Sequence, residues 1–346
     1  MLKSQTSFRQ ATVLAVAAGA LTLAAVGYGL AQSAGIDPSK VKVSQETAVD
    51  PALQRFLRGG KRKGGLAGSG RILFGTEVRP GAYPFQVGVI RDESSLCGGA
   101  LIRDNWVLTA AHCVKVSDGS KYVNAAPGTF DVYVGSNQLV KGDRVKVVEV
   151  YSHPDYIPAF TDNDVALLKL ARVPQGVRYE KIAIVTPQNE ATLSAAGTRM
   201  RIIGWGKSEE GKIQQNLREA SVTMVDRATC NNNIVTSRLI NVLGELQRLR
   251  LSREKMEEFL DKIGRYAGPL VTDSMICAGV PNPTADQSRV TDTCQGDSGG
   301  PLFTQSGSTW TQVGIVSWGE GCGLPKLHGV YTRLGKFAPW VNSTIK

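Results

Sequence analysis

From Ile72 onward the sequence is a succession of short β-rich segments separated by Gly, Pro and Asn. In chain order they read PFQVGVI, WVLTAA, FDVYVG, VKVVEVY, DVALLKL, RMRIIGWG, ASVTMV, TQVGIVSW and GVYTRL. Many short strands at this spacing are typical of a β-sandwich or a β-barrel and not of alternating β/α units. The 346 residues of the chain are enough for one large all-β domain or for two ordinary domains.

One segment, from about Ile234 to Tyr266, interrupts this pattern. Its apolar residues recur at helical spacing in two runs: Leu239, Val242, Leu246, Leu249, and then Met256, Leu260, Ile263. Ser252 stands before the second run and can cap a helix, so the segment predicts a helical hairpin. The last residues, GKFAPWVNSTIK, predict a short closing helix.

The first 31 residues are interpreted as a secretory signal peptide. Lys3 and Arg9 precede a weakly apolar run from Ala11 to Leu30, and Gly29-Leu30-Ala31 offers small residues for cleavage. The run is also about long enough to span a bilayer, so an uncleaved membrane anchor is the alternative. Because Ala and Gly dominate the run, we expect cleavage and a secreted or periplasmic protein.

Residues 32–71 are polar, poor in aromatic side chains and end in LRGGKRKGGLAGSGR, which predicts a flexible, protease-accessible propeptide or linker. Much of the net charge of +10 lies before the β-rich part, because 10 Lys+Arg and only 3 Asp+Glu occur up to Arg71. The remainder is close to neutral. Nucleic-acid binding therefore has no support from the charge.

Six cysteines in an exported chain predict three disulfides, for which counting alone allows 15 pairings. No C-x-x-C motif occurs. The three histidines, His112, His153 and His328, are far apart in the sequence. A zinc site therefore has little support.

The sequence DTCQGDSGGP contains G-x-S-x-G, the motif that exposes a nucleophilic serine in α/β-hydrolases, here Ser298. In that fold the base follows the serine, so His328 would have to serve, with Glu320 as the only carboxylate between them. The motif also needs a strand before the serine and a helix after it. SRVTDTCQ precedes the motif here and Pro301 begins another β-like run, so the context excludes this interpretation.

The order His, Asp, Ser fits better, because His112 ends LTAAHC and Asp164 opens an apolar strand in TDNDVALLKL. From Ile72 to Lys346 the chain resembles the trypsin-like serine proteases of the chymotrypsin family. Their motifs occur in the same order as CGGALIRDNWVLTAAHC, DNDVALLKL, GWG, CQGDSGGP and VSWGEGCG…GVYTR. The resemblance implies an all-β fold of two six-stranded antiparallel barrels, carrying the helical hairpin as an insertion.

The resemblance makes Ser298 the nucleophile, His112 the general acid/base and Asp164 the carboxylate that orients it, the triad of the general template. The backbone N–H groups of Gly296 and Ser298 would form the oxyanion hole. Taken singly, His112 could be a satisfied core histidine and Asp164 a strand cap. The family's disulfides correspond to Cys97–Cys113, Cys230–Cys277 and Cys294–Cys322.

Asp292, six residues before Ser298, matches the floor of the family's specificity pocket, and Gly319 and Gly329 match its open walls. A carboxylate there implies cleavage after Arg or Lys, with Arg able to bind in a bidentate manner. A solvated loop charge is the alternative role for Asp292.

Arg71-Ile72 resembles the family's activation site, where cleavage frees an α-amino group that pairs with the carboxylate beside the nucleophile, here Asp297. Phe74 stands where the family usually has Gly, a departure that bears on the efficiency of activation. Because the cut follows an arginine, the inferred specificity permits autoactivation.

Two further departures concern fine specificity and metal binding. His328 replaces the proline or aromatic residue that commonly precedes Gly329. The segment GSNQLVKGDRVKV carries Lys141, Arg144 and a single carboxylate, Asp143, so the calcium loop of some relatives lacks its ligands. We predict no metal and no cofactor.

The sequence thus predicts a secreted trypsin-like endopeptidase made as a zymogen, acting on proteins or peptides with Arg or Lys before the scissile bond. A protein inhibitor or an exosite partner is possible, and a membrane is involved only if the signal stays uncleaved. The rival hypothesis is a non-catalytic binding protein on the same scaffold. The helical insertion could pack on the barrel or serve as an exosite.

Overall fold

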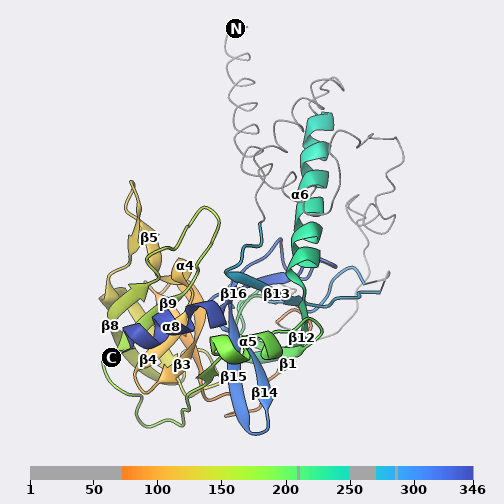
Figure 1. Ribbon diagram of the computed structural model, residues 1–346. Coiled ribbons are helices and arrows are strands. Elements are labelled where there is room, and N and C mark those ends of the chain that lie inside the picture. The colour runs from red at the N-terminus through yellow and green to blue at the C-terminus, as the bar shows by residue number, and fades with distance from the viewer. Residues whose placement is uncertain (1–71, 209–210, 249–269, 285–286, 346) are drawn as a thin grey trace. The chain divides into compact units, whose positions relative to one another are not determined.

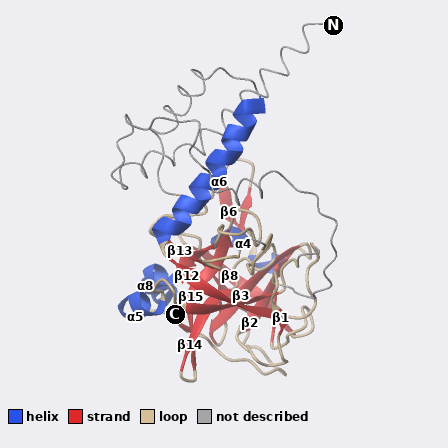
Figure 2. Cartoon of the chain, turned by 90° about the vertical axis from the view of Figure 1, so that its right-hand side faces the viewer, coloured by secondary structure: helices blue, strands red, loops and turns tan. Residues whose placement is uncertain are grey.

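The computed structural model describes residues 72–208, 211–248, 270–284 and 287–345, and the side chains of 242–248 are not among them. The predicted signal peptide, the propeptide, Arg71 and the second helix of the predicted hairpin, with Ser252, lie outside these residues. Strands make up most of the regular structure that is described (Figure 2). None of the described helices is both long and apolar enough to cross a lipid bilayer.

Six antiparallel strands close the first barrel in the order β2-β3-β4-β9-β8-β7. Their bounds are β2 Gln86–Arg91, β3 Ser95–Arg103, β4 Trp106–Thr109, β7 Phe130–Val134, β8 Asp143–Ser152 and β9 Ala166–Leu170. In β8, the buried Val145 and Val147 alternate with the exposed Arg144 and Lys146. This period of two fills the barrel with apolar side chains and leaves the charges in water.

The second barrel runs in the order β12-β11-β14-β15-β16-β13 and closes through the pairing of β12 with β13. Its strands are β11 Arg199–Gly204, β12 Arg218–Val225, β13 Met275–Gly279, β14 Pro301–Ser306, β15 Thr309–Trp318 and β16 Gly329–Arg333. Two short strands extend this sheet, β1 Thr76–Glu77 beside β12 and β10 Ala183–Ile184 beside β15. The predicted pair of six-stranded antiparallel barrels is confirmed (Figure 1).

The remaining described elements are short, apart from two helices: α4 Ala111–Val114, β5 Lys115–Ser117, β6 Tyr122–Asn124, the 3₁₀ turn η2 Pro127–Thr129, α5 Pro187–Leu193, α6 Arg227–Arg248 and α8 Leu334–Thr344. Helix α8 is the closing helix that the sequence predicts. Helix α5 was not predicted, although Thr186 and Asn189 form a capping box at its start.

Helix α6 is the first helix of the predicted hairpin, but it begins at Arg227 and not near Ile234. Asp226 lies between β12 and α6, and its Oδ1 accepts the N–H of Thr229 at 2.8 Å, which satisfies one donor of the first helical turn. The apolar periodicity marks only the later turns, so the predicted start was wrong.

An aromatic cluster links the two barrels. Tyr83 and Phe85 lie just before β2, the first strand of the first barrel. Phe303 belongs to β14 and Trp310 to β15. Their rings meet edge to face with centroids 5.3–5.9 Å apart. Such pairs add stabilisation to the burial of their area.

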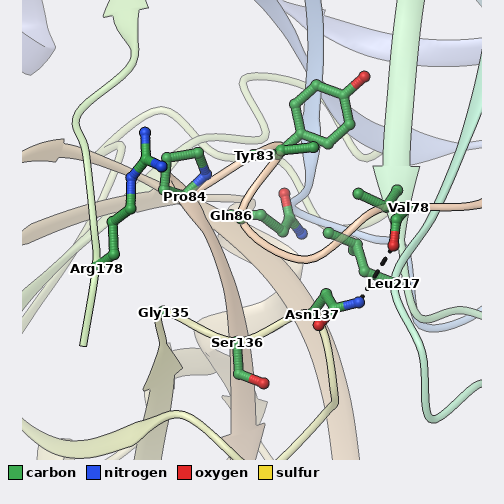
Figure 3. Close-up of a pocket in the computed structure, with 11 residues that line it drawn as sticks. Val78, Tyr83, Pro84, Gln86, Gly135, Ser136, Asn137, Arg178 and Leu217 are labelled. Atoms are coloured by element: carbon green, nitrogen blue, oxygen red, sulfur yellow. Dashed lines mark hydrogen bonds between the residues drawn. The ribbon is translucent and has the colours of Figure 1, made fainter. Parts of the chain in front are cut away.

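A small pocket of about 40 Å³ lies beside this cluster, lined by residues that include Tyr83, Gln86, Asn137 and Arg178 (Figure 3). The Asn137 amide donates to the carbonyl of Val78 at 3.2 Å across one wall. None of the candidate catalytic residues lines this pocket.

Candidate active site

His112 and Asp164 meet where two neighbouring strands of the first barrel end and begin. His112 lies in α4, the single turn after β4, and Asp164 lies just before β9. Because β4 and β9 are antiparallel neighbours, these ends are adjacent. Nδ1 of His112 lies 2.7 Å from Oδ2 of Asp164, and the His112 backbone N–H donates to Oδ1 at 2.8 Å.

Two residues of the second barrel also form hydrogen bonds with Asp164. Asp164 is buried, with 1% of its surface exposed. The Ser317 hydroxyl donates to Oδ2 at 2.5 Å, and the Thr332 hydroxyl donates to the backbone carbonyl of Asp164 at 2.6 Å. These hydroxyls belong to β15 and β16, so both barrels orient the carboxylate that faces the imidazole. A buried, fully hydrogen-bonded group of this kind keeps one orientation.

Asp164 raises the pKa of His112 above its ordinary value. Burial is the largest influence and acts in the opposite direction, because it disfavours the charged imidazolium. The negative charge of Asp164 and its hydrogen bond together outweigh burial. The imidazole is therefore prepared to accept a proton, as a general base must.

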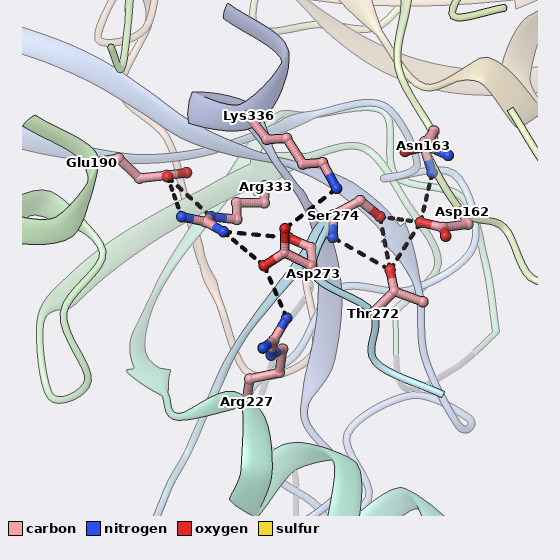
Figure 4. A network of polar contacts seen from close by, with 9 residues as sticks. All are labelled: Asp162, Asn163, Glu190, Arg227, Thr272, Asp273, Ser274, Arg333 and Lys336. Atoms are coloured by element: carbon pink, nitrogen blue, oxygen red, sulfur yellow. Dashed lines mark hydrogen bonds and ion pairs between the residues drawn. The ribbon is translucent and has the colours of Figure 1, made fainter. Parts of the chain in front are cut away.

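The loop that carries Asp164 is tied to the second barrel two residues earlier. Asp162 Oδ1 accepts hydrogen bonds from the hydroxyl of Thr272, at 2.9 Å, and from that of Ser274 (Figure 4). The carboxylate of Asp273, between these two residues, pairs with three cations, Arg227, Arg333 and Lys336. The loop is thus anchored by the segment that leads into β13.

Ser298 lies in the turn before β14, and this turn docks on the first barrel. The N–H of Gly98, in β3, donates to the Ser298 carbonyl at 2.7 Å. A Cβ at Gly98 would lie only 3.0 Å from the Cα of Gly300. Glycine at this position therefore lets the two barrels approach each other at the candidate nucleophile.

The Cys97–Cys113 disulfide is the common neighbour of the candidate nucleophile and base. Sγ of Cys113 lies 3.7 Å from His112 Nε2 and 3.6 Å from the Ser298 carbonyl oxygen. Among the described residues no hydrogen bond joins the Ser298 hydroxyl to His112. Catalytic hydrogen bonds are often long before substrate binds.

The three disulfides of the structure join the pairs that the resemblance implies: Cys97–Cys113, Cys230–Cys277 and Cys294–Cys322. The first lies against the histidine turn and the third ties the serine turn to the loop after β15. Cys97, Cys113 and His112 are close enough to hold a metal, but both sulfurs are bonded to each other and offer no thiolate.

The turn at Gly296 exposes two backbone donors. Within the described part of the chain, the N–H groups of Gly296 and Ser298 have no backbone acceptor, whereas those of Asp297 and Gly299 donate to the carbonyls of Cys294 and Val316. Gly296 has a φ of +101°, which other residues rarely adopt. The two free donors are those expected for an oxyanion hole.

Asp292 is a buried carboxyl, 5% exposed, that accepts hydrogen bonds from backbone donors and forms no ion pair with a described residue. It accepts the N–H of Thr293 at 2.8 Å and that of Gly323 at 2.9 Å. Burial raises the pKa of Asp292 to about 7, because no ion pair with a described residue offsets the lost hydration. A Cβ at Gly329 would lie 3.0 Å from Oδ1, so this glycine keeps the approach to the carboxyl open. At Gly319 a Cβ would make only ordinary contacts.

Asp297 is the second buried carboxyl, and its residue is fully buried. It accepts the N–H of Gly206 at 2.7 Å and that of Cys294 at 3.0 Å. Neither Gly204 nor Gly206 leaves room for a Cβ against this carboxylate. Burial raises the pKa of Asp297 to about 6, and no cation among the described residues pairs with it.

The segment after Arg71 is inserted into the protein. Ile72 and Leu73 are buried, and Leu73 forms an antiparallel bridge with Asp292. Phe74 is 49% exposed and has a φ of 59°. The family's glycine would adopt this conformation without strain, so Phe74 carries a local backbone cost while its side chain points away from the core.

His328 packs against β13 of the second barrel, directly before Gly329 of β16. Its residue is 4% exposed, and a Cβ at Gly279 of β13 would lie 2.7 Å from its Nδ1. Burial lowers the pKa of His328. The ring is therefore a neutral packing group on β13.

The single carboxylate of the segment GSNQLVKGDRVKV, Asp143 at the start of β8, is already paired. Asp143 binds Arg172 through both oxygens at 2.6 and 2.7 Å. Asp131, on β7, binds Arg144 and Lys146. Carboxylates neutralised in this way make poor calcium ligands.

The sequence interpretation missed Ser317 and Thr332 as groups that hold Asp164, and Asp162 as the anchor of its loop. Ser317 stands in the quoted VSWGEGCG motif, but its role depends on which strand ends face each other. The sequence of a single chain does not reveal which strand ends are neighbours.

The chain is similar to known proteins over most of its length. The family model described as Trypsin matches residues 72–341. Vitamin K-dependent protein C of Mus musculus is 31% identical over 278 residues, and that of Rattus norvegicus is 32% identical over 279 residues. Each match covers 80% of this chain but 52% of the relative, so the chain spans about half the length of these relatives. The chain therefore belongs to the trypsin family of serine proteases.

Proposed function

We propose that the protein is a secreted serine endopeptidase, made as a zymogen, that hydrolyses peptide bonds after Arg or Lys. The observation that carries this proposal is the joint placement of three groups. The His112–Asp164 pair and the Ser298 turn adjoin the same disulfide in a member of this family.

The arrangement supports acyl transfer in two steps. The Ser298 hydroxyl attacks the peptide carbonyl while His112 takes its proton, and Asp164 stabilises the imidazolium. The N–H groups of Gly296 and Ser298 bind the oxyanion. His112 then donates the proton to the leaving amine, and the acyl-enzyme remains. Water attacks this ester after losing a proton to His112, which returns the proton to Ser298 as the acid product leaves.

The covalent step has a direct test. A fluorophosphonate probe should label the activated protein stoichiometrically at Ser298, as mass spectrometry of the tryptic peptide would report. Absence of labelling in a folded, activated sample would favour the rival hypothesis of a non-catalytic binding protein.

Asp292 supports the specificity for cations, because a buried carboxyl without a cation gains a partner when Arg or Lys enters. We expect Asp292→Ser to lower kcat/KM for an Arg amide, with a loss of roughly 2–5 kcal/mol of transition-state stabilisation.

The pH dependence of kcat/KM gives a second test of Asp292. The reaction requires a neutral His112 and an ionised Asp292, so the loss of a proton from each group makes kcat/KM rise with pH. The log(kcat/KM) profile should approach a slope of 2 below pH 6 in the unaltered enzyme and of 1 in Asp292→Ser, since the profile reports the free enzyme.

Asp104, which forms an exposed ion pair with Lys181, provides a control for the Asp292→Ser substitution. Asp104→Ser should leave the rate constant and the slope unaltered. Equal slopes in the Asp292→Ser and unaltered enzymes, or an initial preference for Phe or Tyr over Arg, would show that Asp292 does not hold the substrate.

Asp297 supports the zymogen hypothesis. Cleavage after Arg71 would give Ile72 a free α-amino group, and the fully buried Asp297 carboxyl lacks a cation in the described part of the uncut chain. The bridge between Leu73 and Asp292 brings the new terminus to the segment that leads into the serine turn. An ion pair there would order the donors of the oxyanion hole.

A further inference from the structure

The turn just before Asp164 has a backbone conformation that its residues do not favour. Thr161 has a φ of 52° and Asn163 a φ of 54°, on either side of Asp162. A positive φ is uncommon for residues other than glycine and is least tolerated by β-branched side chains such as threonine. Such a conformation persists only where surrounding contacts hold it. The orientation of Asp164 toward His112 therefore depends on the contacts that fix this turn.

Three donors converge on one oxygen of Asp162. Its Oδ1 accepts the hydroxyl of Thr272 at 2.9 Å, the hydroxyl of Ser274, and the backbone N–H of Asn163 at 2.9 Å. Thr272 and Ser274 stand just before β13 of the second barrel, whereas Asn163 belongs to the turn itself. A single side-chain oxygen thus joins the strained turn to the second barrel. We call Asp162, Thr272 and Ser274 the Asp162 clamp.

The clamp uses only one side of residues 272–274. Thr272 and Ser274 point toward Asp162, while Asp273 between them points the other way, as alternate side chains of an extended segment do (Figure 4). Ser274 is buried, whereas the Asp273 side chain is 63% exposed, so the ion pairs of Asp273 contribute little to holding the segment. Hydrogen bonds shielded from water hold their groups more firmly. The hydroxyl side is therefore the one that fixes the turn.

The clamp lies next to a contact that holds Asp164 itself. The backbone N–H of Arg333 donates to the carbonyl of Ser274 at 2.8 Å. The neighbouring Thr332 donates its hydroxyl to the backbone carbonyl of Asp164. Two hydrogen-bonded segments of the second barrel therefore hold residues 162 and 164 of the same loop.

We propose that Asp162 is a positioning residue of the active site, whose hydrogen bonds with Thr272 and Ser274 keep the carboxylate of Asp164 against His112. The proposal rests on the proposed function and adds to it a residue that acts through Asp164. Loss of the clamp lets the turn relax toward ordinary φ values and moves Asp164 relative to the imidazole. A misplacement of about 1 Å in a catalytic site can cost about 100-fold in rate.

The pH profile of kcat separates positioning from a loss of folded protein. In the enzyme–substrate complex Asp292 is paired with the substrate cation, so kcat rises with pH as His112 loses its proton. Asp164 raises the pKa of His112. The other titratable groups that line the surface beside the ring are the same in every variant: Lys115, Tyr122 and Tyr156. A displaced Asp164 therefore lowers both the plateau of kcat and the pH of its midpoint, whereas a smaller folded fraction lowers only the plateau.

The test measures kcat for an Arg amide as a function of pH, with enzyme that has been activated by trypsin and then purified. In Asp162→Ala we expect the plateau to fall by about 10- to 100-fold and the midpoint to move to lower pH. The double variant Thr272→Val/Ser274→Ala should show the same changes, because it removes both hydroxyl donors and keeps the charge of Asp162. It carries the test if Asp162→Ala does not fold. All three substitutions together should add no further loss, since they remove one shared interaction.

Two control variants separate the clamp from other effects of the same residues. Asp162→Asn removes the negative charge but keeps an oxygen that can accept the three hydrogen bonds, so its plateau and midpoint should stay close to those of the unaltered enzyme. Asp273→Asn weakens the exposed ion pairs on the other side of the segment and should leave the midpoint unaltered.

Three results would overturn the proposal while the proposed function stands. The first is an unaltered midpoint in the double variant. The second is a midpoint in Asp162→Asn as low as that in Asp162→Ala, which would assign the effect to the charge of Asp162. The third is an equal shift in Asp273→Asn, which would assign it to the segment as a whole. Absence of hydrolysis by the unaltered, activated enzyme would instead contradict the proposed function itself.

Discussion

Replacement of Ser298 by Ala is expected to lower kcat for hydrolysis of an Arg amide by on the order of 10⁴-fold or more, because the three groups act as a unit. His112→Ala and Asp164→Asn should cause losses of similar size. Asparagine can keep a hydrogen bond to Ser317 but cannot stabilise the imidazolium. Steady-state hydrolysis by the purified, activated variants measures the effect.

Ser343→Ala is the matched control for Ser298→Ala, because it removes an exposed hydroxyl that only contacts the carbonyl of Trp340, at 2.9 Å. Its activity should equal that of the unaltered enzyme. Circular dichroism should show that all the variants fold. Near-normal activity in any folded triad variant would contradict the assignment of that residue.

Arg71→Gln is expected to give a precursor that trypsin does not cut at this bond and that stays inactive. Without the cut, Ile72 has no free amino group to pair with Asp297. Asp297→Asn should be cut normally but remain poorly active, since removal of one partner of a buried ion pair costs about 3–5 kcal/mol. Sequencing of the new N-terminus and hydrolysis of an Arg amide separate the two defects.

Arg71→Lys is the control for the first variant, because trypsin cuts after lysine and the same Ile72 terminus forms. It should become fully active. An uncut Arg71→Gln protein with full activity would refute the zymogen hypothesis, and full activity in Asp297→Asn would show that the ion pair does not switch the enzyme.

The strands were predictable because strand formation depends on local alternation, such as Val145 and Val147 in β8, and on the turn residues between strands. Their arrangement in two barrels was implied only by the family resemblance. His112, Asp164 and Ser298 could be proposed as site residues because each stands in a long motif. Their convergence is a property of strand order, which a single chain's local pattern does not contain. For this reason the sequence predicts which side chains belong to the site but not which residues surround them.

The parts that escaped prediction depend on contacts between distant segments. Ser317 holds Asp164 across 153 residues of sequence, and Thr272 holds Asp162 across 110. The start of α6 depends on a single side-chain cap at Asp226, which hydrophobic periodicity does not register.

The buried Asp292 and Asp297 make the stability of the uncut protein depend on protons. Both pKa values, about 7 and about 6, lie above that of an exposed aspartate, so the folded precursor binds more protons than the unfolded chain between about pH 4 and 7. Stability from these groups is fully present below pH 4 and is lost as the pH rises through the folded values. Cutting at Arg71 would give Asp297 a cation and remove its share of this loss. The share of Asp292 would remain until a cationic substrate side chain enters, so proteolysis and substrate binding would each relieve one of the two buried carboxyls.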